Sequence, residues 1–473
     1  MDKSTYTWDS YQHDIPDWFR DAKFGLFFHW GPYSVPAHGG EWYSRNIYDR
    51  GHEQNRYHVK TYGKVNEFGY KDLIPLFKAE KFDPRVWAEL VKLSGARYAG
   101  PVSEHADNFS LWDSQVNPVN AYRMGPRRDV VGECFEEFRK RGIRCIATFH
   151  HQWLWGWYMG TETESDVYDP ANEMYYGQIL PLETNRYIPY QWPNDRFNIM
   201  WRDKVLEVIN RYRPDEVYFD SRANLIPDIY KQQICDALYR NPDTLITYKQ
   251  HDFPEGTAVV DIECGRFSDT KDYPWQVDDK LEDFTSWCYN PDPIYKSPTR
   301  IIHQLCDIVS KNGNLLLNVG PKADGTFDER AVKTLSKIGD WLRICGEAIY
   351  GTRPFAIAQE GPTVMKDNNY DVKKISAQIE KGYMMEETIP DFTSEDIRFT
   401  KKGDTVYAIA MDWPRDGRFL IKSLGLKGPK GRIASVSMVG NDGKIQWAQQ
   451  EDGLVIDCAM DKPYEHAFAF RID

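Results

Sequence analysis

The sequence of 473 residues predicts an α/β protein, with a (β/α)8-like (TIM) barrel over residues 1–352 and a small C-terminal antiparallel β-sandwich over residues 353–473. Short apolar runs alternate with amphipathic stretches in the first part, which is the order of parallel β/α units. Histidines and carboxylates follow several of these runs, as they do at the C-terminal face of barrel enzymes. A doubly wound open sheet is the structural alternative, but no GxGxxG follows the first strand.

The first predicted strand covers residues 24–28, a continuous apolar run of the kind that is buried on both faces. It stops at His29, and a loop rich in glycine and proline leads on to Glu41 and Trp42. Further strands are predicted at residues 97–102, 143–149, 216–219, 245–248, 258–262 and 314–319. Apolar spacing and capping residues predict helices at residues 84–93, 128–141, 197–212, 227–239, 298–310 and 329–344.

Two regions depart from this alternation. Residues 158–198 are rich in tyrosine, proline and acidic side chains and lack periodicity, so we expect an insertion over the barrel mouth. Beyond about residue 350, glycine, aspartate and lysine turns separate short alternating stretches. They predict sandwich strands at residues 405–410, 418–421, 433–438 and 454–456, with a domain boundary between residues 345 and 360.

Composition narrows the class of function. The net charge of −12 argues against nucleic acid or an anionic membrane as partner. Aromatic residues make up 14% of the chain, which suits a protein that packs rings against sugars. No apolar run is long enough to cross a membrane, and the first residues lack the apolar centre of a signal peptide. The location is therefore secreted or periplasmic if a signal was removed, and otherwise cytoplasmic; the oligomeric state stays open.

Five residues follow predicted strands and should meet at one mouth of the barrel: His29, His105, His150, Asp220 and Glu263. Asp220 has the clearest signal, because the apolar run Val-Tyr-Phe delivers a single carboxylate to a site rich in aromatic residues. A carboxylate can attack an anomeric carbon to form an ester, and a second carboxyl group about 5–5.5 Å away then serves as acid and base.

The stretch HWGPYSVPA at residues 29–37, followed by EWY at 41–43, resembles the opening signature of the α-L-fucosidases of glycoside hydrolase family 29. This resemblance implies that His29, Glu41 and Trp42 line the sugar pocket. It also implies that Asp220, in VYFD, is the nucleophile, with Tyr218 where a tryptophan is commoner in the family. Glu263, in VVDIECGR, is the matching candidate for the acid/base.

Further stretches that resemble motifs of the family imply roles for other residues. SEHADNFSLWDS resembles the family's KHHDGFxLWDS, so His105 keeps the first histidine while Ala106 replaces the second. His150 falls near a sugar-binding position, and Trp287, in SWCY, matches the aromatic residue that packs against the methyl group of fucose. In many members a Trp-Glu pair precedes this motif, whereas here the pair ends in Gln276. Other acid/base candidates are Glu282, Asp278 and Asp279, in a cluster expected to form a solvated loop.

The resemblance implies a retaining exo-α-L-fucosidase that acts on fucosylated oligosaccharides or glycoconjugates and needs no metal or organic cofactor. One alternative is a metal-dependent barrel hydrolase, because histidines and carboxylates at strand ends also bind zinc; the sequence lacks HxH and HExxH spacing. The other alternative is a catalytically impaired carbohydrate-binding barrel, which Ala106 and Gln276 would permit. A chelator separates the first from a fucosidase, and a hydrolysis assay separates the second.

Overall fold

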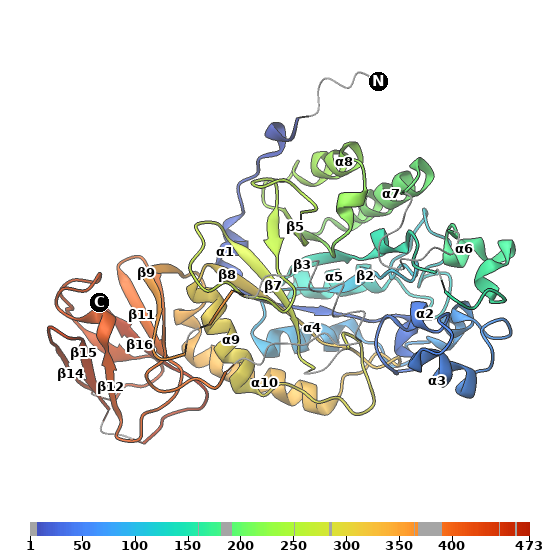
Figure 1. The fold of residues 1–473 in the computed structure, drawn as a ribbon. Coiled ribbons are helices and arrows are strands. Elements are labelled where there is room, and N and C mark those ends of the chain that lie inside the picture. Colours follow the sequence, from blue (N-terminus) through green and yellow to red (C-terminus); the bar gives the residue numbers. More distant parts are fainter. Residues whose placement is uncertain are drawn as a thin grey trace.

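Eight parallel strands close into a barrel in the computed structural model. The structure describes residues 7–158, 160–180, 192–249, 251–282, 286–363, 365–367, 390–443, 445–458 and 461–473. Strands that follow one another in the chain pair in parallel, and β8 pairs with β1 to complete the ring (Figure 1). The strands are β1 (Phe24–Phe28), β2 (Tyr98–Glu104), β3 (Arg144–Phe149), β4 (Glu216–Phe219), β5 (Leu245–Lys249), β6 (Val259–Asp261), β7 (Trp275–Lys280) and β8 (Gly313–Asn318). The predicted barrel is confirmed.

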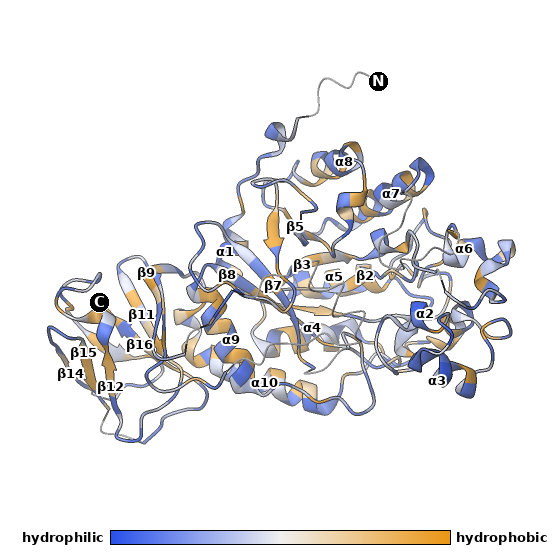
Figure 2. Cartoon of the chain, viewed as in Figure 1, coloured by the Kyte–Doolittle hydropathy of each residue, from blue (hydrophilic) through white to orange (hydrophobic). Residues whose placement is uncertain are grey.

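Helices cover the outside of the barrel because each turns an apolar stripe toward it; Figure 2 shows α7 and α8 with one hydrophobic and one hydrophilic face. In α4 the Asp83 side chain caps the first turn, Pro84 occupies the first position, and Gly95 ends the helix at φ 86°. The helices are α1 (Asp17–Ala22), α2 (Tyr43–Asn46), α3 (Glu53–Thr61), α4 (Pro84–Ser94), α5 (Val130–Lys140), α6 (Glu173–Tyr176), α7 (Asp195–Tyr212), α8 (Asp228–Leu238), α9 (Pro298–Ser310) and α10 (Glu329–Cys345).

The barrel interior is a packed core of side chains from alternating strand positions. Phe27, Tyr98, Ile146 and Tyr218 fill it and are fully buried. Close packing explains the glycine in the first strand, since a Cβ atom at Gly25 would lie 2.5 Å from the ring of Tyr98. Because the interior is filled, the carboxyl end of the barrel is the place for chemistry.

The C-terminal part is an antiparallel β-sandwich. One sheet has the order β13-β16-β11-β10-β9 and the other β12-β15-β14, and side chains of both sheets share one core, so the predicted sandwich is confirmed. Arg398 Nε on β10 donates to Asp307 Oδ1 on α9 at 2.6 Å, which ties the sandwich to the barrel. The strands are β9 (Arg353–Glu360), β10 (Ile397–Lys402), β11 (Thr405–Ala410), β12 (Arg418–Ile421), β13 (Val436–Met438), β14 (Gln446–Gln449), β15 (Leu454–Asp457) and β16 (Phe468–Ile472).

Strand β7 was not predicted from the sequence. The stretch Trp-Gln-Val-Asp-Asp-Lys does not read as a strand because half of it is charged, and Asp278 and Asp279 were expected in a solvated loop. That expectation is wrong, because both side chains are buried inside β7. The expected insertion at residues 158–198 lies partly outside the described residues, and its described part contains α6. The boundary at residues 352/353 stays a prediction.

All eight cysteines are free thiols, and seven of them are buried. Within the described ranges, none of the helices has both the length and the apolar character needed to span a bilayer.

Candidate active site

Every strand of the barrel brings a polar side chain to the carboxyl end. Four of these residues directly follow their strands, three end them, and one lies two residues beyond. Because the strands are parallel, all of these positions lie on one face of the ring. In chain order they are His29, His105, His150, Asp220, Lys249, Glu263, Lys280 and Asn318.

The backbone of Asp220 is held firmly at the end of β4. Its carbonyl oxygen accepts hydrogen bonds from Gln152 Nε2 at 2.9 Å and from Trp153 Nε1 at 2.8 Å. The next two residues, Ser221 and Arg222, have φ values of 44° and 64°, so a left-handed turn leads the chain away from the strand. Such conformations are costly for residues other than glycine and gather at functional sites. The carboxylate is therefore presented at the mouth by a fixed backbone.

Lys249, the last residue of β5, joins the carboxylates of the site. Its Nζ lies 2.5 Å from Asp220 Oδ1, 3.0 Å from Glu263 Oε2 and 2.8 Å from Asp278 Oδ2. Burial alone would lower the pKa of Lys249, but these three carboxylates raise it above the ordinary lysine value, so the ammonium stays charged. Lys249 was not among the residues predicted for the site. Its position directly after the apolar run of β5 was the available signal.

Glu263 lies beyond β6 and faces Asp220 across the Lys249 ammonium. Burial raises the pKa of Glu263, while Lys249 lowers it and the negative charge of Asp220 raises it further. The balance lies above the ordinary glutamate value, so Glu263 retains a proton more readily than a glutamate in water. A carboxyl group that holds its proton in this way can serve as a general acid.

Three histidine rings line the mouth beside Asp220. The His105 and His150 rings are stacked at 4.8 Å, and the His29 ring lies 5.1 Å from that of His150. His150 Nε2 lies 3.5 Å from Asp220 Oδ2. Burial lowers the pKa of His29 to about 4 and also lowers the pKa values of His105 and His150, so the rings are neutral near pH 7. Neutral imidazoles can both donate to and accept from hydroxyl groups.

The same rings are the group best placed to hold a metal among the residues that the structure describes. One ring nitrogen from each of the three lies within 4.8 Å of the others. Zinc–nitrogen bonds of about 2.0–2.1 Å would require ligand nitrogens about 3.3 Å apart in tetrahedral geometry. Ring nitrogens as far apart as 4.8 Å would therefore have to move closer together to bind a zinc ion.

A chain of hydrogen bonds links Glu41 to His29. The Trp287 N–H donates to Glu41 Oε2 at 3.0 Å, and Asn318 Nδ2 donates to the Trp287 carbonyl at 2.5 Å. Asn318 Oδ1 then lies 2.8 Å from His29 Nδ1. An amide oxygen only accepts, so the ring proton of His29 is on Nδ1 and its Nε2 is left as an acceptor. Burial raises the pKa of Glu41 to about 7. Asn318 was not predicted from the sequence.

Aromatic rings complete the wall of the site. The Trp42 ring lies 5.7 Å from that of Trp153, the residue that binds the Asp220 carbonyl. The Trp287 ring lies 5.4 Å from His29. The ring of Tyr218 reaches His150 at 6.5 Å, but its hydroxyl donates into the barrel to Asp278 Oδ2 at 3.1 Å. All nine residues predicted for the site therefore lie in one connected set of contacts.

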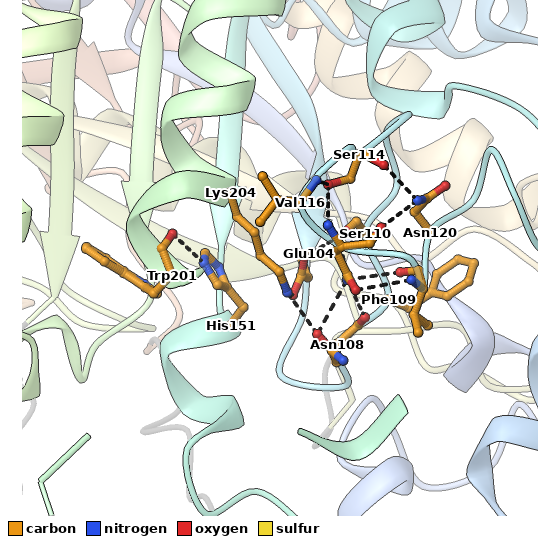
Figure 3. A network of polar contacts seen from close by, with 12 residues as sticks. Glu104, Asn108, Phe109, Ser110, Ser114, Val116, Asn120, His151, Trp201 and Lys204 are labelled. Carbon is orange, nitrogen blue, oxygen red and sulfur yellow. Dashed lines mark hydrogen bonds and ion pairs between the residues drawn. The ribbon is translucent and has the colours of Figure 1, made fainter. Parts of the chain in front are cut away.

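A buried ion pair supports the histidine loops (Figure 3). Lys204 Nζ on α7 donates to Glu104 Oε1 at 2.6 Å and to Asn108 Oδ1 at 2.8 Å, and the Lys204 and Glu104 side chains are fully buried. Glu104 directly precedes His105, and its carbonyl accepts the N–H of His150 at 2.9 Å. The pair thus fixes the ends of β2 and β3 from which both rings project.

The remaining acid/base candidates, and the glutamine that stands in place of the family's glutamate, occupy different places. Asp279 is bound to Lys296 Nζ at 2.7 Å and to Gln304 Nε2 at 2.7 Å, away from Asp220. Gln276 accepts a hydrogen bond from the Tyr98 hydroxyl at 2.9 Å, near the start of β2 and β7, and so does not reach the mouth. Burial raises the pKa of Glu282 to about 7, but among the described residues its carboxyl group forms no ion pair with Lys249, whose carboxylate partners are Asp220, Glu263 and Asp278.

Comparisons with known proteins identify the family of the chain. The family model "Alpha-L-fucosidase" matches residues 1–347, and "Alpha-L-fucosidase C-terminal domain" matches residues 390–473. Tissue alpha-L-fucosidase of Rattus norvegicus is 28% identical over 469 residues, which cover 93% of this chain and 85% of that protein. The Dictyostelium discoideum alpha-L-fucosidase is 28% identical, covering 98% of this chain and 94% of that protein.

Structural similarity extends over the whole chain. The crystal structure of Thermotoga maritima alpha-fucosidase in complex with fucose superposes with a TM-score of 0.76 at 25% identity, covering 99% of each chain. The barrel and the sandwich match the fold of that structure, and both family models describe alpha-L-fucosidases. The chain therefore belongs to the alpha-L-fucosidase family of glycoside hydrolases.

Proposed function

We propose that the chain is a retaining exo-α-L-fucosidase that removes terminal α-L-fucose from glycans through a covalent fucosyl-enzyme. The supporting observation is the pair of Lys249 contacts, 2.5 Å to Asp220 Oδ1 and 3.0 Å to Glu263 Oε2. Contacts of these lengths to one nitrogen limit the separation of the two oxygens to at most about 5.5 Å, the spacing of retaining glycosidases. Inverting enzymes need about 6.5–9.5 Å, to admit a water molecule between the carboxyl groups.

The reaction proceeds in two displacements. Asp220 attacks the anomeric carbon of the fucosyl unit, and the bond to the leaving oxygen breaks as Glu263 gives that oxygen its proton. The resulting ester has the β configuration. Glu263, now a carboxylate, takes a proton from water, and the water oxygen displaces Asp220 to give α-L-fucose. Each inversion cancels the other, so the configuration is retained.

The environment of Glu263 suits both halves of this cycle. In the free site the Asp220 charge helps to raise the pKa of Glu263, which favours the acid form needed first. Once Asp220 is an ester, its negative charge is gone and Lys249 still faces Glu263. The pKa of Glu263 then falls, which favours the base form needed second.

The other predicted residues are proposed to hold the sugar. His29, His105 and His150 present neutral rings to the hydroxyl groups, and Glu41 and Trp42 close the same side. Hydrogen bonds that tighten in the oxocarbenium-like transition state lower the barrier. Trp287 supplies an apolar face for the methyl group, and the ring of Tyr218 lies beneath Asp220 beside Lys249, 5.8 Å from its Nζ.

The test is hydrolysis of an aryl α-L-fucoside by wild type, Asp220→Gly and Glu263→Gly proteins, with and without azide. We expect both variants to lose at least about 10²-fold in kcat. Azide should then attack the substrate directly in Asp220→Gly and give the β-fucosyl azide. In Glu263→Gly it should attack the fucosyl-enzyme and give the α-fucosyl azide. Opposite products assign the two roles.

Glu282→Gln is the matched control, a neighbouring carboxyl that should be dispensable. If Glu282→Gln is inactive and Glu263→Gly is not, the acid/base assignment is wrong. If wild type binds fucose without hydrolysing the aryl fucoside, the carbohydrate-binding alternative replaces this proposal.

A further inference from the structure

The loop that follows β3 holds the main chain at Asp220 from one side. Gln152 lies in the 3-10 turn His151–Leu154 of this loop, and its side chain is 1% exposed. Its Nε2 donates to the carbonyl oxygens of Phe149, Asp220 and Ser221 at 3.1, 2.9 and 2.8 Å, so two amide protons are shared among three acceptors. The Asp220 N–H in turn donates to the Phe149 carbonyl at 3.1 Å. Both backbone polar groups of Asp220 are therefore held by the end of β3 and the loop beyond it.

The loop that follows β5 holds the same turn from the other side. Asp252 is fully buried, and its Oδ2 and Oδ1 accept the N–H groups of Ala223 and Asn224, each at 3.0 Å. These two N–H groups come directly after the two residues with left-handed backbone that follow Asp220. The costly turn is thus anchored before and after its left-handed residues.

The oxygen of the Gln152 amide has no hydrogen-bond partner among the described residues. A buried, unpaired oxygen destabilises a folded protein. Gln449 on β14 offers a comparison, because its Nε2 also donates to three backbone carbonyls, all in the sandwich. There the Oε1 accepts a backbone N–H at 3.0 Å, so both halves of the amide are paired. Stability alone therefore does not account for the glutamine at position 152.

We propose that Gln152 is a positioning residue for the attack by Asp220, and that it acts by fixing the backbone from which the carboxylate projects. This inference rests on the proposed function. A nucleophile has to lie about 3–3.5 Å from the atom it attacks, in correct alignment, and a displacement of about 1 Å can cost 10²-fold in rate. Hydrogen bonds to the N–H and carbonyl groups of Asp220 fix the direction of its Cα–Cβ bond, and hence where its carboxylate lies.

The experiment replaces Gln152 by methionine, which has a similar length but donates no hydrogen bond, in two backgrounds. Where Asp220 is retained, we expect kcat/KM for an aryl α-L-fucoside to fall by about 10- to 100-fold, because formation of the fucosyl-enzyme loses its aligned nucleophile. In Asp220→Gly protein supplied with azide, no carboxylate remains to be positioned. The rate of β-fucosyl azide formation should then be the same, within about twofold, with and without Gln152→Met.

Gln449→Met is the matched control, since it removes the same kind of contact to three carbonyls from the sandwich. It should lower the temperature of thermal unfolding and leave kcat/KM unchanged. Thermal unfolding also checks that each variant folds. If Gln152→Met does not fold, Gln152→Asn keeps the amide on a shorter side chain, and the same pattern should appear with a smaller fall.

An equal fall in both backgrounds overturns this inference, because Gln152 would then support the pocket as a whole. An unchanged kcat/KM in folded Gln152→Met protein overturns it as well, and so does a comparable fall in Gln449→Met. Failure of azide to restore activity to Asp220→Gly overturns the assignment of the nucleophile in the proposed function, and this inference with it.

Discussion

Replacing Glu216 by glutamine should stabilise the protein, and the gain should grow as the pH rises. Glu216 begins β4 with its side chain fully buried in the barrel, where Oε1 accepts the Thr247 hydroxyl at 2.7 Å. Its Oε2 has no partner among the described residues. Burial raises the pKa of Glu216 to about 8. A glutamine keeps an oxygen for Thr247 but never becomes charged.

The size of the effect follows from the two pKa values. The folded state holds a proton that the unfolded chain releases above its ordinary pKa of 4.5, so wild-type stability falls between that pH and about 8. Each unit of difference corresponds to about 1.4 kcal/mol. The free energy of unfolding of Glu216→Gln, relative to wild type, should therefore increase by about 3.5 kcal/mol between pH 5 and pH 8.

Urea unfolding followed by tryptophan fluorescence measures this difference at several pH values. Glu80→Gln is the control, because Glu80 is exposed and its replacement should change stability by a similar small amount at every pH. A Glu216→Gln difference that is the same at pH 5 and pH 8 would mean that Glu216 is not held neutral in the barrel.

Three other perturbations test separate features. Lys204→Met should destabilise the fold by about 3–5 kcal/mol, because it leaves the buried Glu104 carboxylate without a cation; adding Glu104→Gln should recover most of this in urea unfolding, and no recovery would refute the pairing. Gly100→Ala should destabilise by about 3 kcal/mol or more, since its Cβ would lie 1.7 Å from the Ile146 carbonyl oxygen; an unchanged melting temperature would refute this packing. EDTA should leave hydrolysis of an aryl α-L-fucoside unchanged, because the proposed reaction moves protons between carboxyl groups; loss of activity that zinc restores would favour the metal-dependent alternative.

The sequence predicted seven barrel strands because each is an apolar run that ends at a polar residue. It could not predict β7, whose Asp278 and Asp279 read as solvent-exposed. Their burial depends on cations from other strands and helices, Lys249 and Lys296, which periodicity does not reveal. In the sandwich, β9, β10, β14 and β16 were also not predicted, because their pairing depends on partners distant in the chain.

The structure brings together the nine residues that the sequence singled out, but the sequence did not indicate the charges that surround them. Asp220 and Glu263 stand out as single carboxylates after apolar runs. Lys249 does not, because a lysine at the end of a strand is usually solvated. Lys249 joins the site only because β5 lies between β4 and β6. This arrangement brings it to Asp220, which is 29 positions away in the sequence, and to Glu263, which is 14 positions away.

Asn318 gives the barrel a further property. Its side chain, from the last strand, bonds His29 after the first strand, 289 residues earlier, and also the backbone of Trp287. The pairing that closes the barrel therefore also assembles the pocket. A nascent chain released before β8 would carry every candidate carboxylate and yet lack a pocket to use them. Activity therefore requires the closed barrel, and a chain that ends before β8 should be inactive rather than partly active.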